Sequence, residues 1–246
     1  MRVPDPKERL IVALDVDSKE AALSICQKIG SQAAFYKVGL QLFLAEGAEV
    51  VQALKDQGIK VFLDLKLHDI PNQVAGACRK IVKMGVDMTT VHTMGGFDMM
   101  QAAAEAIKQS SQELGVLPPI LLGVTILTSL NQKRAGEIGI TGLISEQVVN
   151  LAALAKESGL DGVVASPHEA GSIRQKMGDD FIIVTPGIRS SDDATQDQKR
   201  VMSACDAIKE GASYLVVGRP IIGADNPANA VAKITSEISR ALQSTR

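Results

Sequence analysis

The stretch KVFLDLKLHDIPNQVAGACRKIVKMG, residues 60–85, decides the fold because it holds one complete strand–helix unit. Lys60–Lys66 is a short run that is mostly apolar, and Asn72–Met84 is a longer amphipathic segment that stops before Gly85. A short apolar strand followed by a helix that closes at a glycine is typical of folds built on a parallel sheet.

The same alternation occurs eight times along the chain. The predicted strands are Arg9–Val16, Phe35–Leu40, Lys60–Lys66, Met88–Thr93, Ile120–Thr128, Gly162–Ser166, Phe181–Thr185 and Tyr214–Gly218. The predicted helices are Ser18–Ile29, Gln41–Gln57, Asn72–Met84, Phe97–Gln109, Ser145–Ser158, His168–Met177, Gln198–Glu210 and Pro227–Leu242. Eight such units predict an α/β protein with a single (β/α)₈ TIM-barrel domain over residues 1–246. A doubly wound sheet is the alternative, which is weakened because ALDVDS, residues 13–18, stands where G-x-G-x-x-G would follow the first strand.

Composition fits this fold and excludes several function classes. Hydrophobic residues make up 46% and aromatic residues 3%, which favours parallel strands covered by helices. The formal net charge is −2 and no block of like charge occurs, so we expect no nucleic-acid or membrane partner. The amino terminus carries acids and prolines unlike a signal peptide, and no apolar stretch approaches ~18 residues. Three widely spaced cysteines form no C-x-x-C pair. We therefore expect a soluble cytoplasmic protein without a disulfide framework.

Charged residues gather at the predicted carboxyl ends of neighbouring strands, where barrels of this class hold their active sites. Asp64 and Lys66 lie two residues apart on one strand and so share a face. Lys37 on the preceding strand and Asp69 just beyond would complete an alternating set, with Asp15 beside them. Such a set is either a structural ion-pair network or a catalytic site. Five charges on adjacent strand ends favour the catalytic site.

The last two strands run into loops that are suited to an anion. TPGIR, residues 185–189, and VGRPI, residues 217–221, combine small or rigid residues with one arginine each. Main-chain N–H groups can approach a phosphate there, and Arg189 and Arg219 can bind it with paired hydrogen bonds. The polar stretch Arg189–Gln198 is expected to be an exposed loop that closes over that phosphate. We expect a phosphorylated substrate.

Metal and nucleotide-fold motifs are weak or absent in the sequence. His68 and His92 are too few and too separated in the sequence for a convincing zinc set. Asp15, Asp64 and Asp69 could hold Mg²⁺, although Lys66 competes for the same carboxylates. No P-loop, nucleophile elbow or dinucleotide turn is present.

The segment DLKLHDIPNQ, residues 64–73, resembles the orotidine 5′-phosphate decarboxylase family. The resemblance covers essentially the whole chain through an ordered series of motifs: ALDV at 13–16, YKVG at 36–39, VHTMGG at 91–96, LTSL at 127–130, TPGIR at 185–189 and VVGRPI at 216–221. Relatives that act on sugar phosphates share the D-x-K-x-x-D element, but the ordered series is specific to this family.

The resemblance implies a homodimer without metal or other cofactor that converts orotidine 5′-phosphate to UMP and CO₂, at the end of pyrimidine synthesis. It implies that Lys66 donates the proton to C6 of the pyrimidine, beside Asp64 and Asp69 of the partner subunit. Asp64 would lie near the leaving carboxylate, where it either destabilises the ground state or positions Lys66. Lys37 and Asp15 would contact the ribose side.

The same resemblance implies the remaining substrate contacts. Thr128 and Ser129 would contact the pyrimidine, and Gln198 would bridge the base and the phosphate. The phosphate would be held by Gly218, Arg189 and Arg219. Further implied contacts are Pro186 and the residues around Lys66: Leu65, Leu67, His68, Ile70, Pro71, Asn72 and Gln73. Gln73 departs from the family, which usually carries Thr at this position and uses it to contact a ribose hydroxyl.

Two other functions stay open at the level of the sequence. One is a Mg²⁺-dependent sugar-phosphate decarboxylase or aldolase of the same superfamily, which a chelator would inactivate. The other is a barrel that binds a phosphorylated ligand without catalysis, which would bind UMP yet release no CO₂.

Overall fold

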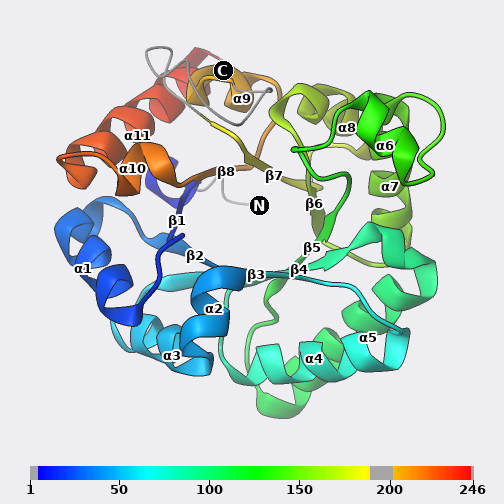
Figure 1. Cartoon of the computed structure of the whole chain (residues 1–246), viewed down its shortest axis with the longest axis horizontal. Helices are drawn as coiled ribbons and strands as arrows, with labels where there is room; N and C mark the ends of the chain where they lie inside the picture. The colour runs from blue at the N-terminus through cyan, green and yellow to red at the C-terminus, as the bar shows by residue number, and fades with distance from the viewer. Residues whose placement is uncertain (1–4, 189–201, 245–246) are drawn as a thin grey trace.

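Eight short apolar runs form the strands of a closed parallel barrel in the computed structural model, which describes residues 5–188 and 202–244. The strands are β1 (Leu10–Ala13), β2 (Phe35–Gly39), β3 (Lys60–Leu67), β4 (Met88–His92), β5 (Ile120–Val124), β6 (Gly162–Val164), β7 (Ile182–Pro186) and β8 (Tyr214–Val217). Each pairs with its neighbours in chain order, and β8 closes the barrel on β1. Figure 1 shows the strands around the centre with helices outside them. The predicted (β/α)₈ barrel is confirmed, and the doubly wound sheet is excluded.

The helices mostly follow the predicted pattern. They are α1 (Lys19–Ile29), α2 (Leu40–Glu46), α3 (Ala48–Asp56), α4 (Pro71–Lys83), α5 (Gly96–Leu114), α6 (Gln132–Glu137), α7 (Ile144–Glu157), α8 (Ala170–Met177), α9 (Ala204–Lys209), α10 (Arg219–Ile222) and α11 (Pro227–Ser244). Four 3₁₀ turns accompany them at Pro6–Glu8, Gly30–Gln32, Thr93–Gly95 and Pro167–Glu169. Within the described ranges, no helix is long and apolar enough to cross a membrane.

Several elements differ from the sequence prediction, and most of the predicted strands are shorter in the structure. The helix predicted over Gln41–Gln57 is two helices, because Gly47 adopts φ +63° between α2 and α3 and breaks the helical path. The fifth strand ends at Val124 rather than Thr128, since the chain turns away after it. The short helices α6 and α10 were not predicted. The helix predicted from Gln198 begins at Ala204 in the described part of the chain.

Strand alternation separates the two surfaces of the barrel wall. In β1, Leu10 and Val12 belong to the cluster between strands and helices, whereas Ile11 and Ala13 pack inside the barrel. The interior cluster consists of Ile11, Ala13, Phe35, Phe62, Met88, Leu122, Val184 and Val216. Lys37 and Asp64 follow Phe35 and Phe62 by two residues and therefore continue the inward-facing rows. The interior is thus apolar in its body and charged at its carboxyl-terminal mouth.

Candidate active site

A cavity of ≈ 300 Å³ opens at the carboxyl ends of the strands. The cavity is lined by eight of the residues that were expected to contact substrate: Asp15, Lys37, Asp64, Lys66, Thr128, Pro186, Gly218 and Arg219. They come from β2, β3 and β7 and from the segments that follow β1, β5 and β8. The location matches the end of the barrel at which this fold class binds its substrates.

Four charges alternate in sign along one wall of the cavity. The Lys37 Nζ atom lies 3.0 Å from Asp15 Oδ1 and 3.9 Å from Asp64 Oδ2. The Lys66 Nζ atom lies 2.8 Å from the same Asp64 oxygen. Asp64 is only 7% exposed, so its carboxylate is compensated by two ammonium groups rather than by bulk water. The predicted grouping of Asp15, Lys37, Asp64 and Lys66 is therefore present.

Gly39 makes room for this wall. It pairs with Asp64 across β2 and β3. A Cβ atom at position 39 would lie 2.9 Å from Lys37 Nζ and 3.5 Å from Asp15 Oδ1. The absence of a side chain at Gly39 lets the Lys37 ammonium reach both carboxylates.

Lys66 sits on an irregular stretch of β3. Leu63 pairs with Thr89 and Leu67 pairs with Val91, so β3 uses four residues where β4 uses two. The extra residues of β3 form a bulge there. Within the bulge Lys66 has φ +51°, the one positive φ outside glycine in the described residues. This left-handed conformation costs a non-glycine residue roughly 1–2 kcal/mol. The bulge re-aims the Lys66 side chain at the cost of local backbone strain.

Thr90, which the sequence analysis missed, contacts two of the charged residues. Its hydroxyl donates to Asp64 Oδ1 at 3.0 Å and accepts from the Lys66 main-chain N–H at 2.9 Å. The one sequence signal for it is a pair of polar residues, Thr89 and Thr90, between the apolar Met88 and Val91.

The β5–β8 side of the cavity is built differently. It presents Thr128, Pro186, Gly187, Gly218 and Arg219, with the single charge of Arg219 at the start of α10. Gly187 adopts φ +83°, and a Cβ atom at Gly218 would touch Asp15 and Ala13 at 3.4 Å. Bare backbone and one guanidinium are suited to an oxyanion.

Four predicted contacts were expected on this side of the cavity: Thr128, Ser129, Arg189 and Gln198. Thr128 lines the cavity although it lies beyond the end of β5. Ser129 is exposed, and its side chain is not part of the cavity wall. Arg189 and Gln198 lie outside the described residues.

The segment that follows Lys66 runs away from the cavity. Leu65 and Leu67 pack against the apolar clusters that lie between the barrel and its helices. Six further residues are exposed and stand outside the cavity wall: His68, Asp69, Ile70, Pro71, Asn72 and Gln73. Asp69 Oδ1 accepts a hydrogen bond of 2.6 Å from the Ile70 N–H. Within one subunit, the fifth predicted charge therefore does not join the other four.

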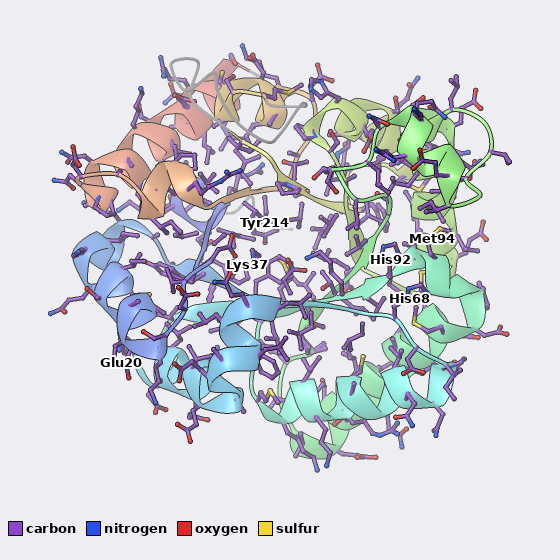
Figure 2. All side chains as sticks on the ribbon, in the orientation of Figure 1. Glu20, Lys37, His68, His92, Met94 and Tyr214 are labelled. Atoms are coloured by element: carbon purple, nitrogen blue, oxygen red, sulfur yellow. The ribbon has the colours of Figure 1, made fainter. Side chains whose placement is uncertain are left out.

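Two histidines stack beside the charged wall. The rings of His68 and His92 are 5.2 Å apart between centroids and inclined by 19°, and Figure 2 shows them next to one another with Met94 nearby. Burial lowers the pKa of His92, and the charges of His68 and Lys66 lower it further. No group of three His, Cys, Asp or Glu side chains suited to a metal ion occurs within residues 5–188 and 202–244.

A closed eight-stranded barrel with an ion-paired lysine and bare backbone around a mouth cavity defines an enzyme of the (β/α)₈ class. Comparison with known proteins narrows this class. Residues 8–234 match the model of the orotidine 5′-phosphate decarboxylase / HUMPS family, so the chain belongs to that family.

Individual relatives agree with the assignment. The orotidine 5′-phosphate decarboxylase of Moorella thermoacetica is 47% identical over 94% of this chain and 92% of its own length. The protein of the same name from Hydrogenovibrio crunogenus is 48% identical over 96% of this chain and 98% of its own length. The crystal structure of orotidine 5′-phosphate decarboxylase from Lactobacillus acidophilus aligns with a TM-score of 0.84 at 39% identity, covering 94% of this chain and 99% of that chain. The predicted resemblance is confirmed, and the relatives are named as decarboxylases.

Proposed function

We propose that this chain converts orotidine 5′-phosphate to UMP and CO₂, as the last step of pyrimidine nucleotide synthesis, and that Lys66 delivers the proton to C6. The observation that carries this proposal is the alternating array Asp15, Lys37, Asp64 and Lys66 on one wall of the cavity. The family assignment and the names of its relatives support the same reaction.

The reaction requires electrostatic stabilisation of the negative charge that develops on C6. When the bond between C6 and the carboxylate breaks, CO₂ leaves and the electron pair stays on C6 in an orbital that cannot delocalise into the ring. A fixed ammonium aimed at this carbon stabilises the developing charge without reorganising solvent. The Lys66 Nζ atom, held 2.8 Å from Asp64, is such a group, and one of its protons then forms the C6–H bond.

The order of strands supports the orientation of the substrate. Around the mouth, β8 is followed by β1, β2 and β3. The loops beside Gly218 and Arg219 would hold the phosphate, Asp15 and Lys37 would contact the ribose, and Lys66 would face C6. Phosphate, ribose and base are linked in the same order in orotidine 5′-phosphate, and Thr128 beyond β5 would meet the base.

The experiment that tests this function follows the loss of orotidine 5′-phosphate by absorbance, with and without EDTA. We expect CO₂ release that is unchanged by EDTA, because the Asp15 and Asp64 carboxylates are engaged by Lys37 and Lys66. Activity that EDTA abolishes would indicate the Mg²⁺-dependent sugar-phosphate relative. Binding of UMP with no turnover of orotidine 5′-phosphate would indicate a binding protein.

We further propose a homodimer in which Asp69 of the partner subunit completes each site. Asp69 lies two residues beyond the end of β3 and stands exposed outside its own cavity wall. Large apolar side chains are also exposed beyond the ends of three successive strands: Ile70 is 64%, Met94 47% and Leu127 41% exposed. Exposed apolar residues after neighbouring strands favour burial against another protein surface.

Subunit mixing tests the shared site. Asp69→Ala and Lys66→Ala subunits should each be inactive as homodimers, and mixing them should restore a fraction of the activity. The recovery is expected because some heterodimers then hold one site with neither lesion. A mixture that stays inactive while subunits measurably exchange would mean that Asp69 does not act across the interface.

A further inference from the structure

We propose that Thr90 is a positioning residue for the decarboxylation, whose hydroxyl holds the Lys66 main chain and the Asp64 carboxylate in one fixed arrangement. This inference rests on the proposed function because its effect is measured on that reaction. It begins with the bulge between β3 and β4. Thr90 is the single β4 residue between the pairs Leu63 with Thr89 and Leu67 with Val91, so it stands opposite the extra β3 residues.

A bulge removes main-chain partners from the residues that it contains. Lys66 lies in this bulge, and its N–H donates to Thr90 Oγ1 at 2.9 Å. A side chain thus replaces the carbonyl that regular pairing would supply. The contact fixes the main chain of a residue whose φ of +51° is unfavourable for any side chain larger than glycine.

The direction of each hydrogen bond is determined by chemistry. A main-chain N–H can only donate and an ionised carboxylate can only accept. The Thr90 hydroxyl must therefore accept from Lys66 and donate to Asp64 Oδ1, at 3.0 Å. The other Asp64 oxygen accepts from Lys66 Nζ at 2.8 Å. The three residues form a closed ring in which Thr90 holds the main chain of Lys66 and Asp64 holds its ammonium.

Neighbouring threonines show that this use of a hydroxyl is unusual here. Thr89, Thr93 and Thr125 each donate to a main-chain carbonyl of an adjacent strand: Leu63, Val124 and Val164, respectively. Thr90 instead donates to a carboxylate of the active site. Both Thr89 and Thr90 are 0% exposed, so solvent cannot replace either hydroxyl bond. Thr89 therefore provides a matched control with the same residue type, strand and burial.

The decisive comparison is Thr90→Val against Thr89→Val in steady-state decarboxylation of orotidine 5′-phosphate. Valine keeps the shape of threonine and removes the hydroxyl. We expect Thr90→Val to lower kcat on the order of 10²-fold, since small misplacements of a reacting group have effects of that size. KM and the affinity for UMP should stay near wild type, because Thr90 is fully buried and does not line the cavity. Thr89→Val should lower thermal stability by a similar amount with little loss of kcat.

Thr90→Ser separates the hydroxyl from packing. Serine restores both hydrogen bonds but not the methyl group, so kcat should recover most of the loss seen in Thr90→Val. The inference is overturned if Thr90→Ser is as slow as Thr90→Val, or if the two valine variants lose kcat equally. If Thr90→Val does not fold, Thr90→Ala against Thr89→Ala gives the same comparison. A wild-type protein without decarboxylase activity would instead refute the proposed function.

Discussion

The two halves of the barrel mouth are lined by different types of residue. In the half that comprises β2, β3 and the segment after β1, a continuous chain of ion pairs joins Asp15, Lys37, Asp64 and Lys66. Thr90 on β4 adds a hydrogen bond to Asp64. The β5–β8 half contributes mainly small or rigid residues and one arginine to the same cavity. Charges whose positions are mutually fixed suit bond breaking, where preorganisation lowers the barrier. Bare backbone with a guanidinium suits the binding of an anion that does not react.

The two halves of the barrel mouth should also respond differently to substitution. In the charged half, one displaced group disturbs its neighbours because Asp64 contacts Lys37, Lys66 and Thr90. In the other half, Arg219 and the backbone at Gly218 are proposed to contact one phosphate, so their contributions would act in parallel. Substitutions in the charged half should therefore reduce kcat, whereas those in the other half should affect both binding and turnover.

The largest effect is expected from Lys66→Ala. It should lower kcat by at least the ~10²–10⁴ of a general acid, because the counter-charge of the carbanion is lost with the proton donor. Lys60→Ala is the matched control on the same strand, since Lys60 pairs with Glu8 at the opposite end of β3. Steady-state assays of both variants, with melting curves, check this prediction. Near wild-type turnover in Lys66→Ala would show that Lys66 is neither the proton donor nor the counter-charge of the carbanion.

A smaller loss is expected from Arg219→Ala. A hydrogen bond to a charged group contributes about 1.5–3 kcal/mol, which corresponds to roughly tenfold to 10²-fold in kcat/KM. We expect both KM and kcat to change, because part of the phosphate binding energy acts in the transition state. Arg134→Ala, which removes an exposed pair with Glu137, is the control. A change in KM alone would show that this half only captures substrate.

Gly39→Ala sharpens the comparison without removing any charge. The new Cβ would meet Lys37 Nζ at 2.9 Å and displace it from Asp15 and Asp64. Loss of about 1 kcal/mol of ion pairing predicts a decrease in kcat/KM of about fivefold. Gly136→Ala, which meets nothing within 4 Å, should be neutral. Equal kinetics for the two variants would show that the position of Lys37 does not matter.

The smallest effect concerns His92 and pH. Burial, then the charges of His68 and Lys66, lower the pKa of His92 in the folded state below its ordinary value of 6.5. As pH falls below 6.5, the unfolded chain binds a proton before the folded one does, so stability falls with pH. His92→Gln should flatten this dependence in denaturant titrations between pH 7 and pH 5. An unchanged slope would contradict the assignment.

The sequence predicted the barrel and most of the charged wall because both depend on periodicity. Eight repeated strand–helix units form the closed barrel, as predicted. The two-residue spacing predicted that Asp64 and Lys66 would share a face, and they form an ion pair, although the bulge at Lys66 interrupts the regular alternation. The bulge could not be predicted, since it depends on the register between β3 and β4. Thr90 was missed for the same reason: threonine is common in strands, and only the bulge gives its hydroxyl these partners.

Other errors have equally local causes. The amphipathic pattern over Gln41–Gln57 predicted one continuous helix. Gly47 divides it in the structure, because its positive φ ends α2. Thr128 was placed at a strand end, yet it reaches the cavity from the segment beyond Val124. The role of Asp69 stays a prediction, as it depends on a second subunit. The contacts of Arg189 and Gln198 also stay predictions.

The division of labour between the two halves is tested most directly by decarboxylation of orotidine, which lacks the phosphate, across a titration with free phosphite. We expect phosphite to bind beside Gly218 and Arg219 and orotidine to bind along the charged wall. We expect a slow basal rate that rises with phosphite and saturates, because binding energy from one half then assists the chemistry in the other. Arg219→Ala should weaken the response. A flat rate, with phosphite shown to bind, would mean that the β5–β8 half contributes affinity alone.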